Sequence, residues 1–147
     1  MKKSILLLLL CAGYAGAQAR PQTQTVTDPN IILRLMRGDV TMIGANFPNA
    51  TFQKGVLNLV RSRAIAKLSL LTTVEQAANM APLKAAGAAV YYLPVKNVRM
   101  TGNSVFVGNN TVILQVGPQQ WTVIQGNQIA AQAKASTNLY FSNAKRY

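Results

Sequence analysis

Apolar residues fall into two alternating patterns along the chain: short, nearly continuous runs and longer stretches at helical spacing. The runs Val40–Ala45, Lys67–Thr72 and Ala88–Leu93 have the composition expected of buried strands. Residues 49–63 carry an apolar stripe at helical spacing between the first two runs, and 74–86 separate the last two. Strand and helix therefore alternate, a pattern that predicts an α/β layer structure with parallel neighbouring strands.

The second half of the chain predicts a hairpin in the middle of the sheet. Ser104–Val107 and Thr111–Val116 are apolar on both faces, and the three residues between them, Gly-Asn-Asn, accept positive φ angles. Trp121–Ile124 follows as a last short strand. A closing helix over 128–141 is then expected, with these residues facing inward: Ile129, Ala133 and Tyr140. The expected fold class is α/β, with a mixed central sheet and helices on both faces.

The first nineteen residues have the three parts of a secretory signal peptide. Lys2 and Lys3 form a basic region, Ile5–Leu10 is an apolar run, and small residues offer cleavage after Ala17 or Ala19. We expect 1–19 to be this signal, 20–29 an extended leader, 30–142 a single domain and 143–147 a basic tail. The protein is then secreted or periplasmic, and no later stretch is apolar enough to cross a membrane as a helix.

Charge and composition restrict the partners. Removing Lys2 and Lys3 lowers the formal net charge from +12 to +10, which favours nucleic acid or an anionic polymer of the cell envelope as a partner. Basic secreted proteins also owe solubility to such charge, so both explanations stand. Two tyrosines, Tyr91 and Tyr92, alternate along a strand, and Trp121 is expected to anchor the core rather than stack on a base.

The chain has few groups that change protonation near neutral pH. It contains no histidine, its single cysteine, Cys11, lies in the signal peptide, and its acids are Asp28, Asp39 and Glu75. General acid–base catalysis and metal binding both depend on such groups. We therefore expect no metal or other cofactor, no catalytic residues, and a protein that is not an enzyme.

Two stretches resemble the phospholipase D superfamily. Leu83–Leu93 is similar to the helix that ends in an Ala-Gly step and leads into a strand, and Ala45-Asn46-Phe47-Pro48 to the loop that opens the family's first helix. The small secreted nucleases of the superfamily, with one H-x-K-x(4)-D motif per chain, are closest in layout. The resemblance implies a homodimer and places the motif's His, Lys and Asp at these positions: Met100, Gly102 and Val107.

Basic and amide residues on two segments form the expected phosphate-binding set. One group lies on the loop that enters the former motif strand, and the other on one face of the helix over 49–63. The six residues are Lys96, Asn97, Arg99, Asn103, Lys54 and Arg61. Each alone is also typical of a solvated loop or helix face.

Two functions follow from these observations. The first is a secreted, catalytically inactive phospholipase D-like module that binds nucleic acid or another phosphate-bearing polyanion. The second is a phosphodiesterase or nuclease-like enzyme of another mechanism. The absence of histidine favours the first, and a phosphodiesterase assay discriminates between them.

Overall fold

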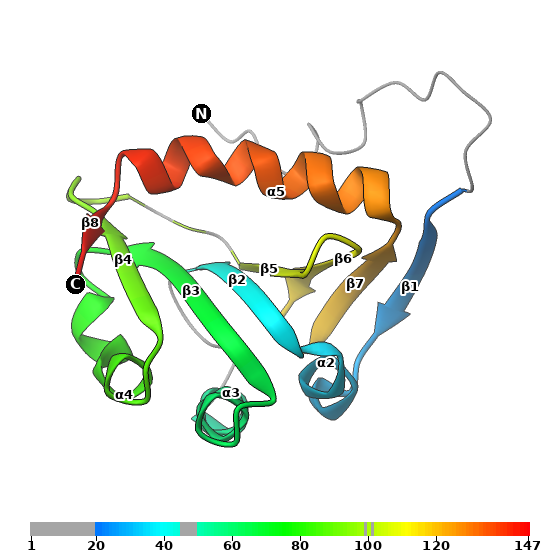
Figure 1. Ribbon diagram of the computed structural model, residues 1–147, viewed down its shortest axis with the longest axis horizontal. Helices are drawn as coiled ribbons and strands as arrows, with labels where there is room; N and C mark the ends of the chain where they lie inside the picture. The colour runs from blue at the N-terminus through cyan, green and yellow to red at the C-terminus, as the bar shows by residue number, and fades with distance from the viewer. Residues whose placement is uncertain (1–19, 45–49, 99, 101) are drawn as a thin grey trace.

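The computed structural model describes residues 20–44, 50–98, 100 and 102–147 and is built around one eight-stranded mixed sheet (Figure 1). The strand order is β1-β7-β6-β5-β2-β3-β4-β8. The strands are β1 (Gln22–Val26), β2 (Gly38–Gly44), β3 (Ile65–Thr73), β4 (Ala89–Leu93), β5 (Asn103–Val107), β6 (Thr111–Gly117), β7 (Gln120–Gln125) and β8 (Lys145–Arg146). The hairpin β5–β6 lies inside the sheet, as its apolar faces predict.

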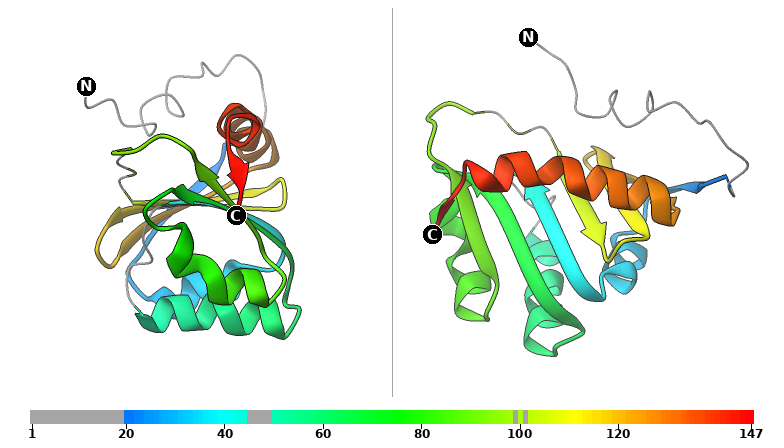
Figure 2. Two further views of the ribbon diagram at one scale, coloured as in Figure 1. Left: turned by 90° about the vertical axis from the view of Figure 1, so that its left-hand side faces the viewer. Right: turned by 45° about the horizontal axis from the view of Figure 1, so that its top comes forward.

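Helices cover both faces of the sheet, which confirms the expected fold class (Figure 2). One face carries α2 (Pro29–Leu35), α3 (Ala50–Arg61) and α4 (Ala81–Ala85), and the other carries α5 (Asn127–Ser142). The segment 74–86, expected as a helix broken or restarted near Pro82, is a 3-10 turn, Ala77–Met80, followed by α4, which has Pro82 in its first turn. No helix within the described ranges is long and apolar enough to span a membrane.

Three parallel strands give the sheet two chemically different edges. β2 pairs in parallel with β3, and β3 with β4, so their carboxyl ends lie together on one edge and their amino ends on the other. β5 runs antiparallel to β2, with Asn103 opposite Gly44. The beginning of β5 therefore lies beside the carboxyl end of β2, which is the edge where open α/β sheets commonly bind ligands.

The core confirms some inward-facing residues and corrects another. Trp121 is 2% exposed and stacks on Phe52 of α3, with ring centroids 6.0 Å apart. In α5, however, the buried residues are Ala130, Ala133 and Thr137. The expectation that Tyr140 faces inward is wrong, since it is 36% exposed.

Both described ends of the chain join the sheet. β1 pairs with β7, so the expected leader contributes an edge strand. β8 pairs Lys145 with Tyr92 at the opposite edge, so the expected tail also contains a strand. The expected signal peptide, residues 1–19, and the Ala45-Asn46-Phe47-Pro48 segment lie outside the described residues.

Candidate phosphodiester site

A row of polar side chains begins at the carboxyl edge of the parallel strands. Asn103, the first residue of β5, is 8% exposed, and its Nδ2 donates a 2.7 Å hydrogen bond to Oε1 of Gln115 on β6. The Gln115 amide donates in turn to the carbonyl oxygen of Gly117 at 3.2 Å. This chain of hydrogen bonds orients both amides next to the end of β2, and amide groups are suited to contact a phosphate.

Two glycines allow this pair of amides to form. A Cβ on Gly44 would overlap the Oδ1 atom of Asn103, so the close approach of β2 and β5 requires glycine there. Gly102 has φ +75°, and a Cβ would lie 2.8 Å from the carbonyl oxygen of Gln115. Both constraints hold the backbone close to the amide side chains, and such close approaches are where glycine is needed.

Thr72 adds a buried hydroxyl to the same edge. It is the second-last residue of β3 and is fully buried, and its Oγ1 makes no hydrogen bond to any described residue. Leu71 pairs with Ile43, so Thr72 follows in register toward the end of β2, near Gly44. An unsatisfied buried hydroxyl is costly, and such groups concentrate where a ligand or water completes them.

Glu75 fixes the loop that follows β4. Its carboxylate accepts a 3.1 Å hydrogen bond from the backbone N–H of Asn97, a residue with φ +63°. Hydrogen bonds from the backbone N–H groups of Glu75 itself and of Asn97 lower the pKa of this carboxyl, with smaller contributions from the Thr73 hydroxyl and the Lys96 charge. The loop that carries Lys96 is thus tied to the end of β3.

Replacing Glu75 with glutamine is expected to change the acid side of the stability profile. The folded pKa lies below the usual value of 4.5, so the carboxylate stabilises the fold above that value and loses its contribution as the pH falls through the folded pKa. Melting temperatures of both proteins between pH 3 and 7 measure this. The wild type should melt higher near pH 7, and the two curves should converge in acid. Parallel curves would contradict the assignment.

The six expected phosphate ligands divide among three places. Lys96, Asn97 and Asn103 lie at the carboxyl edge. Arg61 ends α3 at the opposite edge, and Lys54 lies on the exposed side of α3. Arg99 lies outside the described residues. Three of the five described residues therefore lie at the carboxyl edge, and Arg61 lies at the opposite edge.

The structure also locates the positions that the family motif would occupy. Val107 is a buried residue of β5, paired with Val40 and Thr111, while Gly102 and the half-buried Met100 precede the strand. None of the three side chains can transfer a proton. Sequence reasoning missed Gly44, Thr72 and Gln115, because only the pairing of β2, β3, β5 and β6 brings them together. The sequence feature that could have located Gly44 is the apolar run that precedes it.

The fold is that of the phospholipase D superfamily, as the resemblance implied. No family model and no characterised protein sequence matches this chain. Among solved structures, NucT from Helicobacter pylori is 13% identical, with a TM-score of 0.68 over 87% of this chain and 100% of its own. Nuc from Salmonella typhimurium, a phospholipase D family member, is 12% identical, with a TM-score of 0.62 over 87% and 99%. TrmBL2, an archaeal chromatin protein with a novel mode of DNA binding, is 11% identical, with a TM-score of 0.61 over 97% and 59%.

These relatives overturn the expectation that the chain is not an enzyme. NucT and Nuc share the fold over nearly their whole length, and Nuc belongs to a family named for an enzyme. The expectation rested on the missing histidine. Its absence removes an imidazole nucleophile and general base, but other groups can supply a nucleophile and other residues can orient a phosphate.

Proposed function

We propose that the protein is a nuclease-like phosphodiesterase that acts on nucleic acid at the edge formed by the carboxyl end of β2 and the start of β5. The observation that carries the proposal is the fold shared with NucT and Nuc over 100% and 99% of those chains. The DNA binding named for TrmBL2 and the formal charge of +12 support a nucleic-acid substrate.

The residues at this edge are suited to binding and orienting a phosphodiester. The amides of Asn103 and Gln115 offer donors in a fixed orientation, and the ammonium group of Lys96 offers a positive charge on the adjoining loop. Because the chain has no imidazole, the attack on phosphorus falls to water or to a hydroxyl group. Attack forms the new P–O bond as the bond to one ester oxygen breaks, and the proton lost by the attacking water or hydroxyl group ends on that leaving oxygen.

A hydrolysis assay on the folded chain tests this proposal. We expect release of product from a fluorogenic phosphodiester and from single-stranded DNA above the level of a mock purification. Replacing Asn103 with alanine should lower the rate by roughly 10- to 100-fold, somewhat less than the loss of an oriented donor in a highly developed active site. The assay is run with and without EDTA.

Asn58 provides the control for that variant. It is exposed on α3, and its replacement with alanine should leave the rate unchanged. Melting curves of both variants separate loss of activity from loss of fold. If the folded wild type releases no product, or if the activity does not respond to Asn103→Ala, the phosphodiesterase proposal is wrong.

Location and assembly complete the proposal. Export would follow from the signal peptide expected at 1–19, and a homodimer would follow from the single phospholipase D-like half per chain. Mature mass by mass spectrometry and molar mass by light scattering report on these two points.

A further inference from the structure

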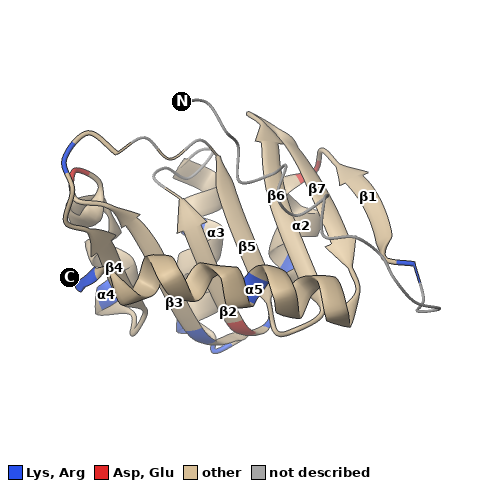
Figure 3. Cartoon of the chain, turned by 90° about the horizontal axis from the view of Figure 1, so that it is seen from above, with Lys and Arg blue, Asp and Glu red and all other residues tan. Residues whose placement is uncertain are grey.

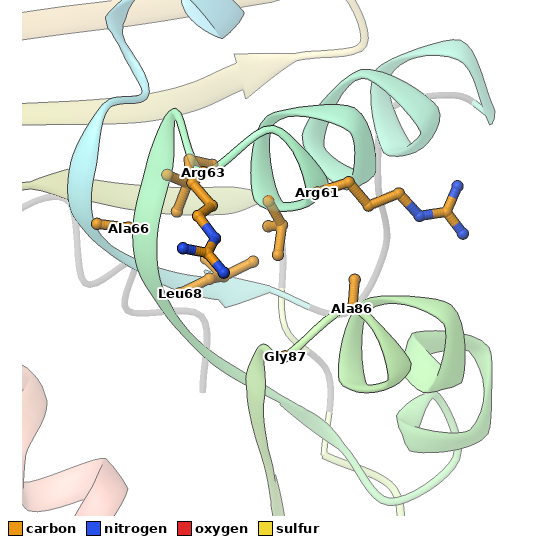
Figure 4. A pocket seen from close by; sticks show the side chains of 8 residues that line it. Arg61, Arg63, Ala66, Leu68, Ala86 and Gly87 are labelled. Atoms are coloured by element: carbon orange, nitrogen blue, oxygen red, sulfur yellow. The ribbon is translucent and has the colours of Figure 1, made fainter.

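A cavity lies at the edge of the sheet opposite the candidate phosphodiester site. Its volume is about 570 Å³, within the range of small-molecule sites. The α3–β3 and α4–β4 connections border it (Figure 4). Its lining residues are Val60, Arg61, Arg63, Ile65, Ala66, Leu68, Ala86 and Gly87. The nine residues of β3 separate the two edges by roughly 30 Å, so this cavity is a different site.

Among the described residues that line the cavity, two arginines are the only charged ones. Arg61 ends α3, and Arg63 lies two residues later in the turn to β3. In Figure 4 the Arg63 side chain lies beside β3 and that of Arg61 points away from it, so the two guanidinium groups border different parts of the cavity. No carboxylate lines it, and within the described part of the chain no ion pair neutralises either arginine.

The backbone at Arg63 is unusual for an arginine. Its φ angle is +61°, a left-handed conformation that non-glycine residues rarely adopt, and its N–H donates a 3.1 Å hydrogen bond to the carbonyl oxygen of Val60. Glycine or asparagine would fit such a turn with less strain. An arginine held in this conformation at the mouth of a cavity is consistent with a binding role.

The rest of the wall is apolar or small. Buried Ile65 and Leu68 form part of the floor, while Ala66, Ala86 and Gly87 leave room for a ligand. Guanidinium groups bind phosphate bidentately, and an apolar floor accepts the flat face of a base. This combination favours a phosphate that carries an organic group over a free inorganic anion.

Further basic residues extend the same edge. Each of the connections into β2, β3 and β4 brings a helix end to the amino end of a parallel strand. Figure 3 shows basic positions near α4 and at the starts of β3 and β2. The residues are Arg34 and Arg37 before β2, Lys67 in β3, and Lys84 in α4. Arg34 and Lys84 lie in the last turns of α2 and α4, where they also complement the negative ends of these helices. Arg37, Arg63 and Lys67 lie beyond the helices.

We propose that this cavity is a second nucleic-acid contact, in which Arg61 and Arg63 each bind a backbone phosphate and the apolar floor contacts a base. The nature of the ligand rests on the proposed function, but the site does not depend on hydrolysis at the other edge. A polynucleotide long enough to reach around the sheet would contact both edges.

The test compares binding of a labelled 20-nucleotide single strand, by fluorescence anisotropy, to the full chain and its variants. Arg61→Gln with Arg63→Gln should weaken binding about tenfold at 50 mM salt and flatten the log–log salt slope by roughly 1.4 units, as expected for two phosphate contacts to a single strand. The matched control is Arg20→Gln with Lys134→Gln, which removes the same charge elsewhere and should weaken binding less than threefold. Equal losses in both pairs would overturn the proposal.

Arg63→Gly separates binding from folding. Glycine relieves the left-handed backbone, so this variant should melt at or above the wild-type temperature and still bind more weakly. A lower melting temperature with unchanged binding would show that Arg63 is structural and overturn the proposal.

Competition identifies the source of the phosphate. Adenosine monophosphate should displace the labelled strand from the wild type at lower concentration than inorganic phosphate does. Equal displacement would assign the cavity to the phosphate group alone, and no displacement by either would overturn the proposal. Hydrolysis of a small fluorogenic diester should be unchanged in Arg61→Gln/Arg63→Gln, so failure here is distinguishable from failure of the phosphodiesterase proposal.

Discussion

Replacing Trp121 with alanine is expected to lower the free energy of unfolding by about 3–5 kcal/mol. The indole is 2% exposed, lies on β7 and stacks on Phe52 of α3 at a centroid distance of 6.0 Å. Its removal leaves a cavity between the sheet and the helix and deletes an aromatic pair. Because β7 also pairs with β1, the loss should extend to the edge of the sheet.

Urea unfolding followed by circular dichroism measures this change. Val116→Ala is the control, because that side chain is 45% exposed on β6 and its truncation should cost little. The pair also tests the expected role of Trp121. If a folded Trp121→Ala protein kept its stability and lost affinity for single-stranded DNA, the indole would be a base-stacking group and its assignment to the core would be wrong.

The strands were predictable because each is specified locally. Short, nearly continuous apolar runs bounded by turn residues are typical of buried strands, and β2, β3 and β4 follow that pattern. Boundaries of helices and strands fall at or beside glycine or proline residues: Gly38, Pro82 and Gly87. The positive φ angles of Gly38 and Gly87, +67° and +108°, give the physical reason.

The orientation of α5 was harder to predict. The apolar residues of α5 are spread around the helix, so several stripes are equally apolar, and Tyr140 was expected to face inward. The structure confirms Ala133 as an inward residue and packs it together with Ala130 against the sheet, since small side chains allow a helix to approach closely. The pairing of β8 with β4 depends on α5 returning the chain to that edge, which the tail sequence does not show.

The candidate site could be predicted only in part. Local sequence placed Asn103 at the start of a strand, but the hydrogen bond from Asn103 to Gln115 depends on the β5–β6 register, and the need for glycine at Gly44 depends on the β2–β5 pairing. The composition led to one wrong expectation, that the chain is not an enzyme. The missing histidine excludes one catalytic mechanism, whereas the fold is shared with NucT and with Nuc, a phospholipase D family member.

Affinity for duplex DNA is expected to fall about 150-fold between 50 and 200 mM salt. This magnitude corresponds to about four neutralised phosphates and a log–log slope of about −3.6, because each contact releases condensed counterions. Fluorescence anisotropy at several salt concentrations gives the slope. Because phosphate contacts do not read sequence, duplexes of different sequence should bind within a few-fold of one another.

The charges of Lys96 and Arg99 should account for part of that slope. Lys96→Ala with Arg99→Ala removes two positive charges and should flatten the slope by at most about 1.8 units. Lys145→Ala with Arg146→Ala, in β8, removes the same charge from the sheet's outer strand. If both pairs flatten the slope equally, binding depends on net charge and not on the carboxyl edge. If affinity does not depend on salt, or binding is absent at 50 mM, nucleic acid is not the substrate, because a protein of charge +12 that engages a phosphate backbone must displace counterions.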